Sequence, residues 1–366
     1  MIASVSPLND GPSGRRPSGA ADCLVTGATG LVGNNVLRML VNRGENVRVL
    51  VRPGTRSAAT PAPASPGGDA LRGLPLETVA AGLLDEPAIQ RAVEGVTSVV
   101  HSAAMVHVGW RHLDEMRRVN VEGTRIVARA ARLAGARLVH VSSVDALGLA
   151  ADGGPADEET PPGGMLECPY VVTKREAEQA VLAEVDRGLD AVIVNPVYMI
   201  GPWDWKPSSG RMLLEVGAGR GLFAPPGSND FVDVRDVARG ILAAREKGRT
   251  GRRYILGGDP LPYVDAWRIF ARVTGRMQPL GIAPPAIVRV AGWCGDLAAL
   301  VSGREPPVNS AAAGMSMLPH NFSSARAERE LGYVRTPFET AVQDAWDWFV
   351  ARGYARALRP RTVLAR

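Results

Sequence analysis

The stretch CLVTGATGLVG, residues 23–33, decides the fold. A short apolar strand runs directly into three glycines spaced three residues apart, and the segment 34–42 that follows has the character of a helix. Gly27 permits a tight turn, Gly30 lets the backbone approach a pyrophosphate, and Gly33 lets the helix pack against the strand. The pattern therefore predicts a strand, a turn and a helix that together bind a dinucleotide.

The length and composition of the chain predict a soluble globular protein. Its 366 residues, 46% hydrophobic and 22% charged, can bury a sizeable core and build one large domain with a smaller appendage. The most apolar segment, Ile287 to Val301, is interrupted by Arg289 and Asp296, so we expect no insertion into a membrane. Residues 1–20 lack the order of a secretion signal, and we expect them to form a disordered leader.

The charge balance argues against a nucleic-acid-binding protein, and the cysteines argue against a disulfide-rich or metal-binding one. The net charge of +5 comes from arginines scattered along the chain, without the basic clusters and interleaved aromatic residues of a nucleic-acid surface. Cys23, Cys168 and Cys294 are far apart and lack metal-ligand spacing, so we expect neither a disulfide framework nor a metal site. The cysteine usage favours a reducing cytoplasm.

Strand-like and helix-like segments alternate along the first half of the chain. Strands are predicted at residues 47–51, 78–81, 98–101, 138–141 and 191–194, and helices at 86–94, 121–133 and 167–185. This alternation is typical of a parallel sheet covered by helices on both faces. We therefore predict an α/β fold with a Rossmann-type doubly wound parallel sheet and a smaller C-terminal substrate-binding region.

The regularity weakens beyond Pro196. A loop at 201–210, a helix at 212–218 and a strand at 230–232 that precedes a helix at 234–245 are expected to form a lid. A late strand at 253–256 and helices ending near Trp348 complete the body. We expect a leader at 1–20, a Rossmann-type domain at 21–200, a mainly substrate-binding region with returning strands and helices at 201–350, and a loose basic tail at 351–366.

Tyr170 and Lys174 lie four residues apart at the start of a predicted helix, so their side chains project from one face. An ammonium group near a phenol favours the phenolate and lowers the pKa of the tyrosine towards the operating pH. The chain holds only three lysines, which makes a chance pairing less frequent. The alternative is an ordinary surface helix with an incidental pair.

Two serines and an asparagine fall at the predicted carboxyl edge of the sheet, where open α/β folds bind ligands. Ser142 and Ser143 follow the strand at 138–141 directly, and Ser143 is suited to hydrogen-bond a reacting oxygen. We assign Ser142 a structural role. Asn120 precedes a predicted helix and, taken alone, is interpreted as its N-cap.

Taken together, these motifs follow the order found in one protein superfamily. They are residues 26–33, 101–104, 120–124, 142–143, 170–174 and 195–197. From about Asp22 to Trp348 the chain resembles the extended short-chain dehydrogenase/reductases of the NAD-dependent epimerase/dehydratase superfamily. The resemblance implies the fold and the class of cofactor, and it leaves the substrate open.

The resemblance implies a role for each matching residue. Tyr170 would be the acid/base, Ser143 would polarise the substrate oxygen, and Lys174 would bind the nicotinamide ribose. Asn120 would support the proton relay. The implied cofactor-binding residues are Gly27, Thr29, Gly30, Leu31, Val32, Gly33, Arg52, Ala103, Tyr170, Lys174, Pro196 and Val197.

The residue after the second strand indicates which cofactor is preferred. An acidic residue there binds the ribose 2′-hydroxyl, whereas an arginine suits a 2′-phosphate. The strand at 47–51 is followed by Arg52, with Arg56 nearby, so we expect NADP(H), with NAD(H) as the alternative. Arg52 stacking on the adenine is the other interpretation.

Where relatives usually show Asp-Leu near the adenine, this chain has Gly82-Leu83, which puts that side-chain contact in doubt.

Segments 47–53, 195–202 and 254–258 resemble the branch of dihydroflavonol-4-reductases and 3β-hydroxysteroid dehydrogenases, which includes bacterial proteins labelled sugar epimerases. Relatives that act on nucleotide sugars usually place a basic residue before the strand that matches Phe231. Here Ser228, Asn229 and Asp230 precede it, which weakens the case for a nucleotide sugar.

Aromatic and other large side chains fall in the loops expected around the substrate. They are His107, Trp110, Met165, Tyr198, Trp203, Trp205 and Phe223. An apolar cleft suits a hydrophobic ketone or alcohol. We expect four residues to contact the substrate: His107, Ser143, Tyr198 and Trp203. The alternative is that the tryptophans fill the junction between the two domains.

Three functions are compatible with the sequence. The first is an NAD(P)-dependent oxidoreductase that transfers hydride between nicotinamide and a carbonyl or alcohol carbon of a small, apolar substrate. The second is a nucleotide-sugar epimerase or dehydratase, and the third is a non-catalytic binder that senses the dinucleotide. The expected partner is a small-molecule substrate, with no nucleic acid, and a homodimer through the helices after Asn120 and Tyr170 is compatible with the resemblance.

Overall fold

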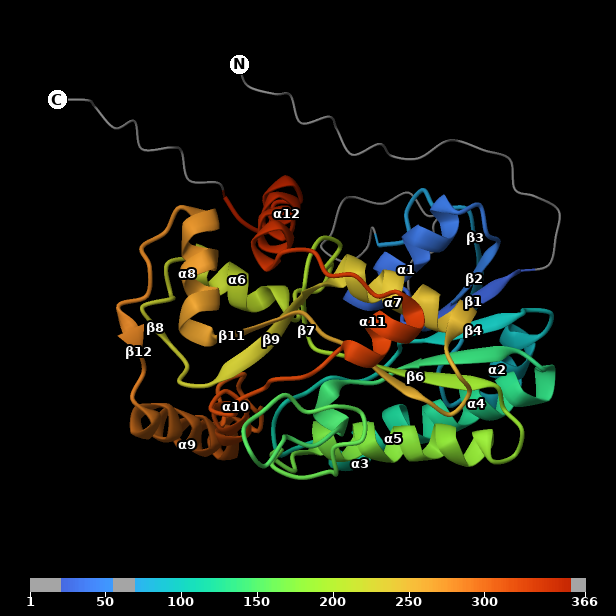
Figure 1. The fold of residues 1–366 in the computed structure, drawn as a ribbon, viewed down its shortest axis with the longest axis horizontal. Helices are drawn as coiled ribbons and strands as arrows, with labels where there is room; N and C mark the ends of the chain where they lie inside the picture. Colours follow the sequence, from blue (N-terminus) through green and yellow to red (C-terminus); the bar gives the residue numbers. More distant parts are fainter. Residues whose placement is uncertain (1–20, 55–69, 357–366) are drawn as a thin grey trace, which may run out of the picture.

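The computed structural model describes residues 21–54 and 70–356. The predicted leader at 1–20, Arg56 and most of the predicted tail lie outside the described residues. The body is built around one large sheet, with a second group of strands and helices beside it (Figure 1).

Seven parallel strands form the large sheet in the order β10, β6, β5, β4, β1, β2, β3. Their bounds are β1 (Cys23–Thr26), β2 (Val47–Val51), β3 (Leu76–Ala80), β4 (Ser98–His101), β5 (Arg137–Val141), β6 (Ala191–Pro196) and β10 (Arg253–Leu256). The order reverses between β1 and β4, which is the switch point at which such sheets bind ligands. The predicted doubly wound Rossmann-type fold is confirmed.

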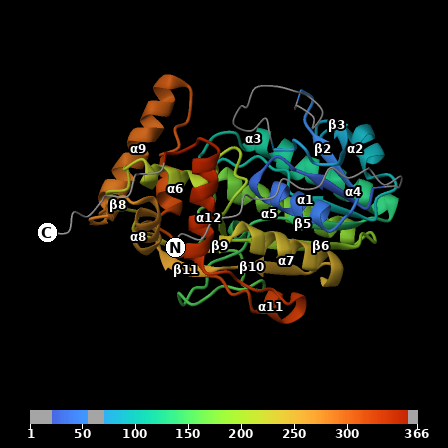
Figure 2. The ribbon, with the colours of Figure 1, turned by 90° about the horizontal axis from the view of Figure 1, so that it is seen from above.

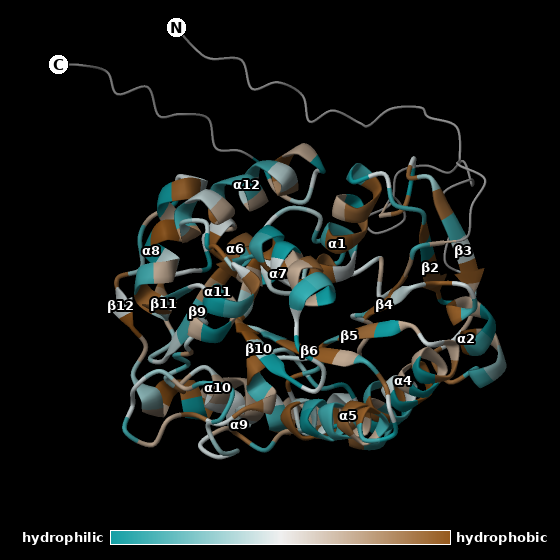
Figure 3. Cartoon of the chain, turned by 45° about the vertical axis from the view of Figure 1, so that its right-hand side comes forward, coloured by the Kyte–Doolittle hydropathy of each residue, from teal (hydrophilic) through white to brown (hydrophobic). Residues whose placement is uncertain are grey.

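The burial of each strand follows its place in the sheet. Strands β1, β4 and β6 are buried along their whole length, as expected for strands covered on both faces. Strand β3 lies at an edge, and its Glu77 faces solvent and pairs with Arg48 at 2.8 Å. A charged side chain at an edge discourages pairing with another sheet. Figure 3 shows hydrophobic residues along the inner strands.

Helices cover both faces of the sheet. Helices α1 (Leu31–Asn42) and α7 (Val234–Lys247) pack together on one face, and α2 (Glu86–Val93), α4 (Gly123–Ala134) and α5 (Pro169–Val185) lie on the other (Figure 1). The prediction that α7 belongs to a lid is wrong. One side of α7 buries Val237, Ile241 and Leu242 against the sheet, so this helix returns to the large domain.

The remaining elements form the second part of the chain. Strands β7 (Tyr198–Ile200), β9 (Ser228–Asp233) and β11 (Asp259–Pro262) make a small sheet, and β8 (Phe223–Ala224) pairs with β12 (Gly281–Ile282). Helix α11 (Ala325–Leu331) is an exception, because it packs against α7 and β10 of the large domain. The helices of the second part are α6 (Gly210–Gly217), α8 (Tyr263–Thr274), α9 (Pro285–Ser302), α10 (Ser310–Met315) and α12 (Phe338–Ala351). Their core is aromatic and includes Phe231, Phe270 and Phe338.

Two of the predicted tryptophans, Trp203 and Trp205, lie at the junction between the two parts. The Arg38 guanidinium of α1 lies 3.4 Å from the centre of the Trp203 ring, and Trp205 is buried against Trp348 of α12. Asn35 of α1 also donates to the Pro202 carbonyl at 3.0 Å. These contacts favour the alternative prediction, that the tryptophans fill the junction, over a substrate role for Trp203.

Asn34 is the polar centre of this junction. Its amide nitrogen donates to the carbonyls of Ala28 at 2.9 Å and Ala70 at 2.8 Å, and its oxygen accepts from the Trp205 indole at 3.3 Å. The side chain is fully buried. It ties the glycine turn to the second part of the chain.

Replacing Asn34 by alanine should lower the free energy of unfolding by about 2–3 kcal/mol, because buried polar groups lose their partners. Asn42→Ala, at the exposed end of the same helix, is the control and should change it little. Urea unfolding followed by circular dichroism measures both. Equal stability of the two variants would contradict this role of Asn34.

Candidate active site

The glycine turn brings three backbone segments into direct contact. Gly27 has a φ of +72°, and a Cβ atom there would lie 2.7 Å from the Ala103 nitrogen. A Cβ at Gly33 would lie 2.3 Å from the Gly27 carbonyl oxygen. Both positions therefore require glycine, since any side chain would force β1, α1 and the loop after β4 apart.

The N-terminus of α1 is free to bind an anion. Gly30 is its N-cap, and neither a capping side chain nor an acidic residue in the first turn satisfies its N–H groups. The positive end of a 12-residue helix and its unpaired donors fit a pyrophosphate. Thr29 lies in the turn, and Leu31 and Val32 begin the helix.

The other residues predicted to bind the cofactor lie at the carboxyl ends of neighbouring strands. Arg52 is exposed directly after β2, and Ala103 follows β4 with its nitrogen 3.3 Å from Thr26 Oγ1. Pro196 ends β6, and the buried Val197 follows it. One edge of the sheet thus carries all of these positions and the glycine turn.

A buried polar chain connects the strand ends beneath this edge. The two ring nitrogens of His101 lie 2.7 Å from Thr26 Oγ1 and 3.0 Å from Thr124 Oγ1, and Thr124 donates to the Asn120 carbonyl at 2.5 Å. Burial, and next the charge of Lys174, lowers the pKa of His101 to about 3. The imidazole is therefore neutral at physiological pH and acts as a fixed hydrogen-bonding link.

Asn120 fastens the loop after β4 to helix α5. It lies in a π-helical turn, Arg117–Glu122, which follows the short helix α3 (Leu113–Met116). Its side chain accepts from the Met105 nitrogen at 2.7 Å and donates to the Met105 carbonyl at 3.0 Å and to Thr173 Oγ1 at 3.2 Å. The interpretation as an N-cap is wrong, because the helix has already begun before this residue.

Ser143, Tyr170 and Lys174 meet at this edge from two elements. Ser143 follows β5 and caps the short 3₁₀ helix Val144–Ala146, whereas the other two residues lie in the first turns of α5. Lys174 is buried, and its Nζ donates to the Val141 carbonyl at 3.2 Å and lies 6.0 Å from the centre of the Tyr170 ring. Burial lowers the pKa of Lys174 to about 8, opposed by Glu178 and then Asp145.

The pKa of Tyr170 is shifted in the direction opposite to the one predicted. Burial, and next the carboxylate of Asp145, raises it above the usual value, and a hydrogen bond with Ser143 opposes the shift. Lys174 is not among the groups that lower the pKa of Tyr170, and its ammonium donates to the Val141 carbonyl. The phenol is therefore protonated at neutral pH in the free protein.

Asp145 and His320 are functional candidates that the sequence did not reveal. Ser143 Oγ donates to Asp145 Oδ2 at 2.9 Å, and His320 Nε2 lies 3.7 Å from Asp145 Oδ1. His320 is buried, and its Nδ1 lies 3.3 Å from the Ser228 carbonyl oxygen. Asp145 could have been suspected from its place two residues after Ser143, whereas nothing in the sequence connects His320 to β5.

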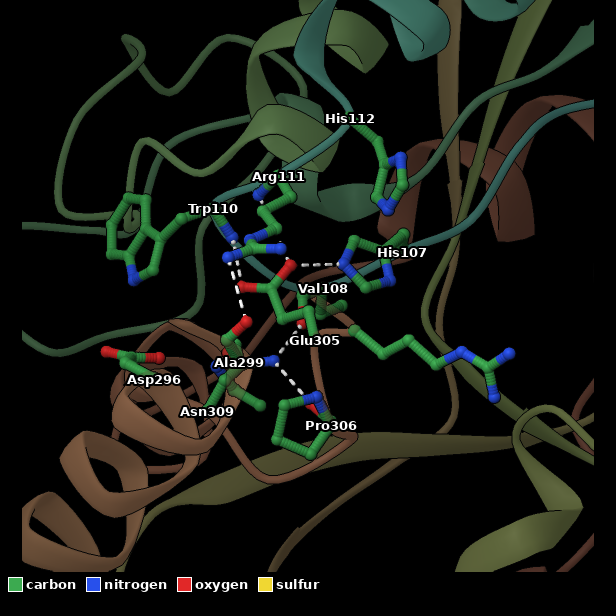
Figure 4. A network of polar contacts seen from close by, with 12 residues as sticks. His107, Val108, Trp110, Arg111, His112, Asp296, Ala299, Glu305, Pro306 and Asn309 are labelled. Carbon is green, nitrogen blue, oxygen red and sulfur yellow. Dashed lines mark hydrogen bonds and ion pairs between the residues drawn. The ribbon is translucent and has the colours of Figure 1, made fainter. Parts of the chain in front are cut away.

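The remaining predicted substrate residues have partners within the protein. His107 Nε2 lies 2.6 Å from Glu305 Oε2 in the polar network of Figure 4. The Tyr198 hydroxyl donates to the Ser209 carbonyl at 2.7 Å. Met165 is buried in the cluster against which Tyr170 packs.

Comparisons with known proteins agree with this arrangement. A model of the NAD dependent epimerase/dehydratase family matches residues 23–257. The chain is 36% identical over 334 residues to the sterol demethylase protein B of Methylococcus capsulatus, covering 90% of this chain and 98% of that protein. It is 34% identical to a putative dihydroflavonol 4-reductase of Synechocystis, covering 92% and 97%. The crystal structure of gox2253 matches with a TM-score of 0.77 and 35% identity, covering 92% of this chain and 99% of that one.

Turnover at this site should fall as the pH rises through about 8, because the Lys174 ammonium loses its proton there. Asp145→Asn should move this fall to lower pH, since the carboxylate raises the pKa of Lys174. The measurement is the pH profile of kcat/KM. Asp186→Asn, on the exposed end of α5, is the control. Identical profiles for the wild type and Asp145→Asn would contradict this coupling.

Proposed function

The chain belongs to the NAD-dependent epimerase/dehydratase family, as an NAD(P)-dependent oxidoreductase of the extended short-chain dehydrogenase/reductase type, and we propose that it reduces a hydrophobic carbonyl compound with NADPH or oxidises the corresponding alcohol. The observation that carries this proposal is the meeting of Ser143 and a protonated Tyr170 at the sheet edge that also holds the glycine turn. Because the relatives of this chain include reductases and dehydrogenases, we do not favour the non-catalytic binder.

The proposed mechanism assigns one task to each residue. The Tyr170 phenol donates its proton to the carbonyl oxygen during reduction and removes it from the alcohol during oxidation. The Ser143 hydroxyl polarises the same oxygen. The Lys174 ammonium stabilises the phenolate that forms. Asn120 acts as a positioning residue, since its amide holds the loop after β4 against α5.

The cofactor would lie along the carboxyl edge of the sheet. The N-terminus of α1 would bind the pyrophosphate, Arg52 the adenosine end, and Pro196 and Val197 would border the nicotinamide. When bound, the nicotinamide supplies or accepts the hydride. Lys174 would release Val141 and bind the ribose.

Apolar surroundings of Tyr170 support a hydrophobic substrate. Tyr170 packs against a cluster of buried apolar residues that includes Val144, Met165 and Val197. The segment before Phe231 offers no cation for a diphosphate, because Asn229 donates to the Tyr263 hydroxyl at 2.9 Å and Asp230 is fully buried. The names of the two relatives, a sterol demethylase protein and a dihydroflavonol reductase, agree with this class of substrate.

One observation favours a second candidate function, a nucleotide-sugar epimerase or dehydratase. Asp145 and His320 place a second acid and base beside Ser143, and an elimination needs such a group in addition to the tyrosine. Mass spectrometry of the nucleotide released on denaturation discriminates between the two. Stoichiometric, tightly held NAD favours the second candidate, whereas an empty protein that binds NADPH reversibly favours the exchanging reductase.

We also propose that the protein works in the cytoplasm. The free thiols of Cys23, Cys168 and Cys294 are compatible with a reducing cytoplasm.

A homodimer through α4 and α5, the helices that follow Asn120 and Tyr170, is a separate proposal and is testable by the mass of the protein in solution.

Replacing Tyr170 by phenylalanine should lower turnover by about 10²- to 10⁴-fold, because the proton donor is lost. Binding of NADPH, measured by fluorescence titration, should change little. Ser143→Ala should also lower kcat, whereas Ser142→Ala, whose hydroxyl has no partner among the described residues, serves as the matched control. Undiminished activity of Tyr170→Phe would overturn the mechanism.

Replacing Arg52 by glutamine should weaken NADPH binding about tenfold, because the 2′-phosphate loses a charged hydrogen-bond partner. Binding of NADH should stay unchanged. Arg91→Gln, an exposed arginine of α2, controls for the general loss of positive charge. If NADH binds more tightly than NADPH to the wild type, the proposed cofactor preference is wrong.

A further inference from the structure

Helix α9 presents an apolar face that the described part of the chain leaves uncovered. Only 11% of the helix is buried, and it is the one helix among the described residues that is long and apolar enough to cross a membrane by length and composition. Six large side chains at helical spacing are between 52% and 86% exposed, and together we call them the α9 face. They are Ile287, Val290, Trp293, Leu297, Leu300 and Val301.

The apolar surface continues beyond the helix. Met277, Leu280 and Ile282 precede α9 directly and are at least half exposed, and β12 pairs with β8, which carries the exposed Phe223. Figure 2 shows α9 projecting from the body at the end where β8 lies. Contiguous exposed apolar surfaces of this kind mark binding sites for proteins or membranes.

The opposite side of α9 is fastened to the protein along its length. A Cβ atom at Gly292 would lie 2.8 Å from Ser310 Cα, and one at Gly295 would lie 1.9 Å from the Val308 carbonyl oxygen. These glycines let α9 pack closely on α10 and the segment before it. A helix held flat in this way does not span a bilayer without leaving its partner, so its free face is suited to lie on a surface.

The charges around the α9 face are positive. Residues 275–308 contain three arginines and two acidic residues. Both acids are engaged internally, because Asp296 accepts from the Ser310 nitrogen at 3.1 Å and Glu305 from His107 and the nitrogens of Trp110 and Arg111. Arg289 and Arg304 are exposed and have no acidic partner among the residues described here.

These charges discriminate between the candidate occupants. In a contact between two copies of the α9 face, unpaired arginines of both copies would come together without carboxylates to neutralise them. An anionic lipid surface instead attracts them, and an exposed tryptophan on an apolar helix face is typical of helices that lie in the membrane interface. We propose that the α9 face docks this protein onto the surface of an anionic phospholipid bilayer, without spanning it.

Docking there would place the bilayer beside the loop that borders the active site. Arg111 donates to the carbonyls of Ala299 and Gly303 at the end of α9, each at 3.0 Å (Figure 4). Glu305 holds His107 in the same loop, and Asn120 holds the loop at Met105. The docking proposal does not depend on the identity of the substrate, so it stands or falls separately from the proposed reaction.

The test is cosedimentation of the full chain with vesicles of phosphatidylglycerol and, separately, of phosphatidylcholine, without substrate or cofactor. The wild type should bind the anionic vesicles, and added salt should weaken binding. The double variant Leu297→Gln, Leu300→Gln should bind at least about tenfold more weakly. The control variant Leu133→Gln, Val334→Gln replaces two equally exposed apolar residues elsewhere and should bind like the wild type.

Trp293 gives an independent readout. Quenching of fluorescence by bromine-labelled lipid in the vesicles should be strong in the wild type and largely lost in Trp293→Phe. Equal binding of the wild type and the α9 double variant would overturn the proposal, as would equal binding to the two lipids. A wild-type dimer that the double variant dissociates would assign the face to a second copy and would also overturn it. Catalytic activity, measured in parallel, reports on the proposed reaction alone.

Discussion

The whole site depends on how closely the backbone packs at Gly27 and Gly33. Neither position has room for a Cβ atom, since the Ala103 nitrogen and the Gly27 carbonyl oxygen occupy that space. This contact sets the distance between β1, α1 and the loop after β4. The N-terminus of α1 therefore opens at the same sheet edge as Ser143 and Tyr170, and an anion bound there would lie at the same edge as the proton donor.

Polar ties between the strand ends keep that edge in place. Asn120 joins Met105 to Thr173, and the neutral His101 bridges Thr26 and Thr124. Each tie connects elements that are distant in the sequence. Their donors and acceptors are buried, so breaking any one of them leaves an unpaired polar group, and the edge is more rigid than its loops alone would make it.

Much of the large domain could be predicted because its signals are local. Buried strands such as β2 and β10 have the predicted bounds, and the glycine spacing placed the turn correctly. Long-range packing decided the rest. The π-helical turn at Asn120 depends on its contacts with α5. Helix α7 returns to the sheet because its apolar side packs there. The Trp203 ring lies against the guanidinium of Arg38 in α1.

Local sequence signals and long-range contacts also give different answers for the pKa of Tyr170. Its spacing from Lys174 predicts a lowered pKa of the phenol, but the charge that acts on it depends on which groups face it. Asp145 disfavours the phenolate, whereas Lys174 is bound to the Val141 carbonyl. The free protein therefore holds Tyr170 in the form that donates a proton. Release of Lys174 from Val141, which ribose binding would bring about, would make the phenolate accessible and allow the same residue to work in the reverse direction.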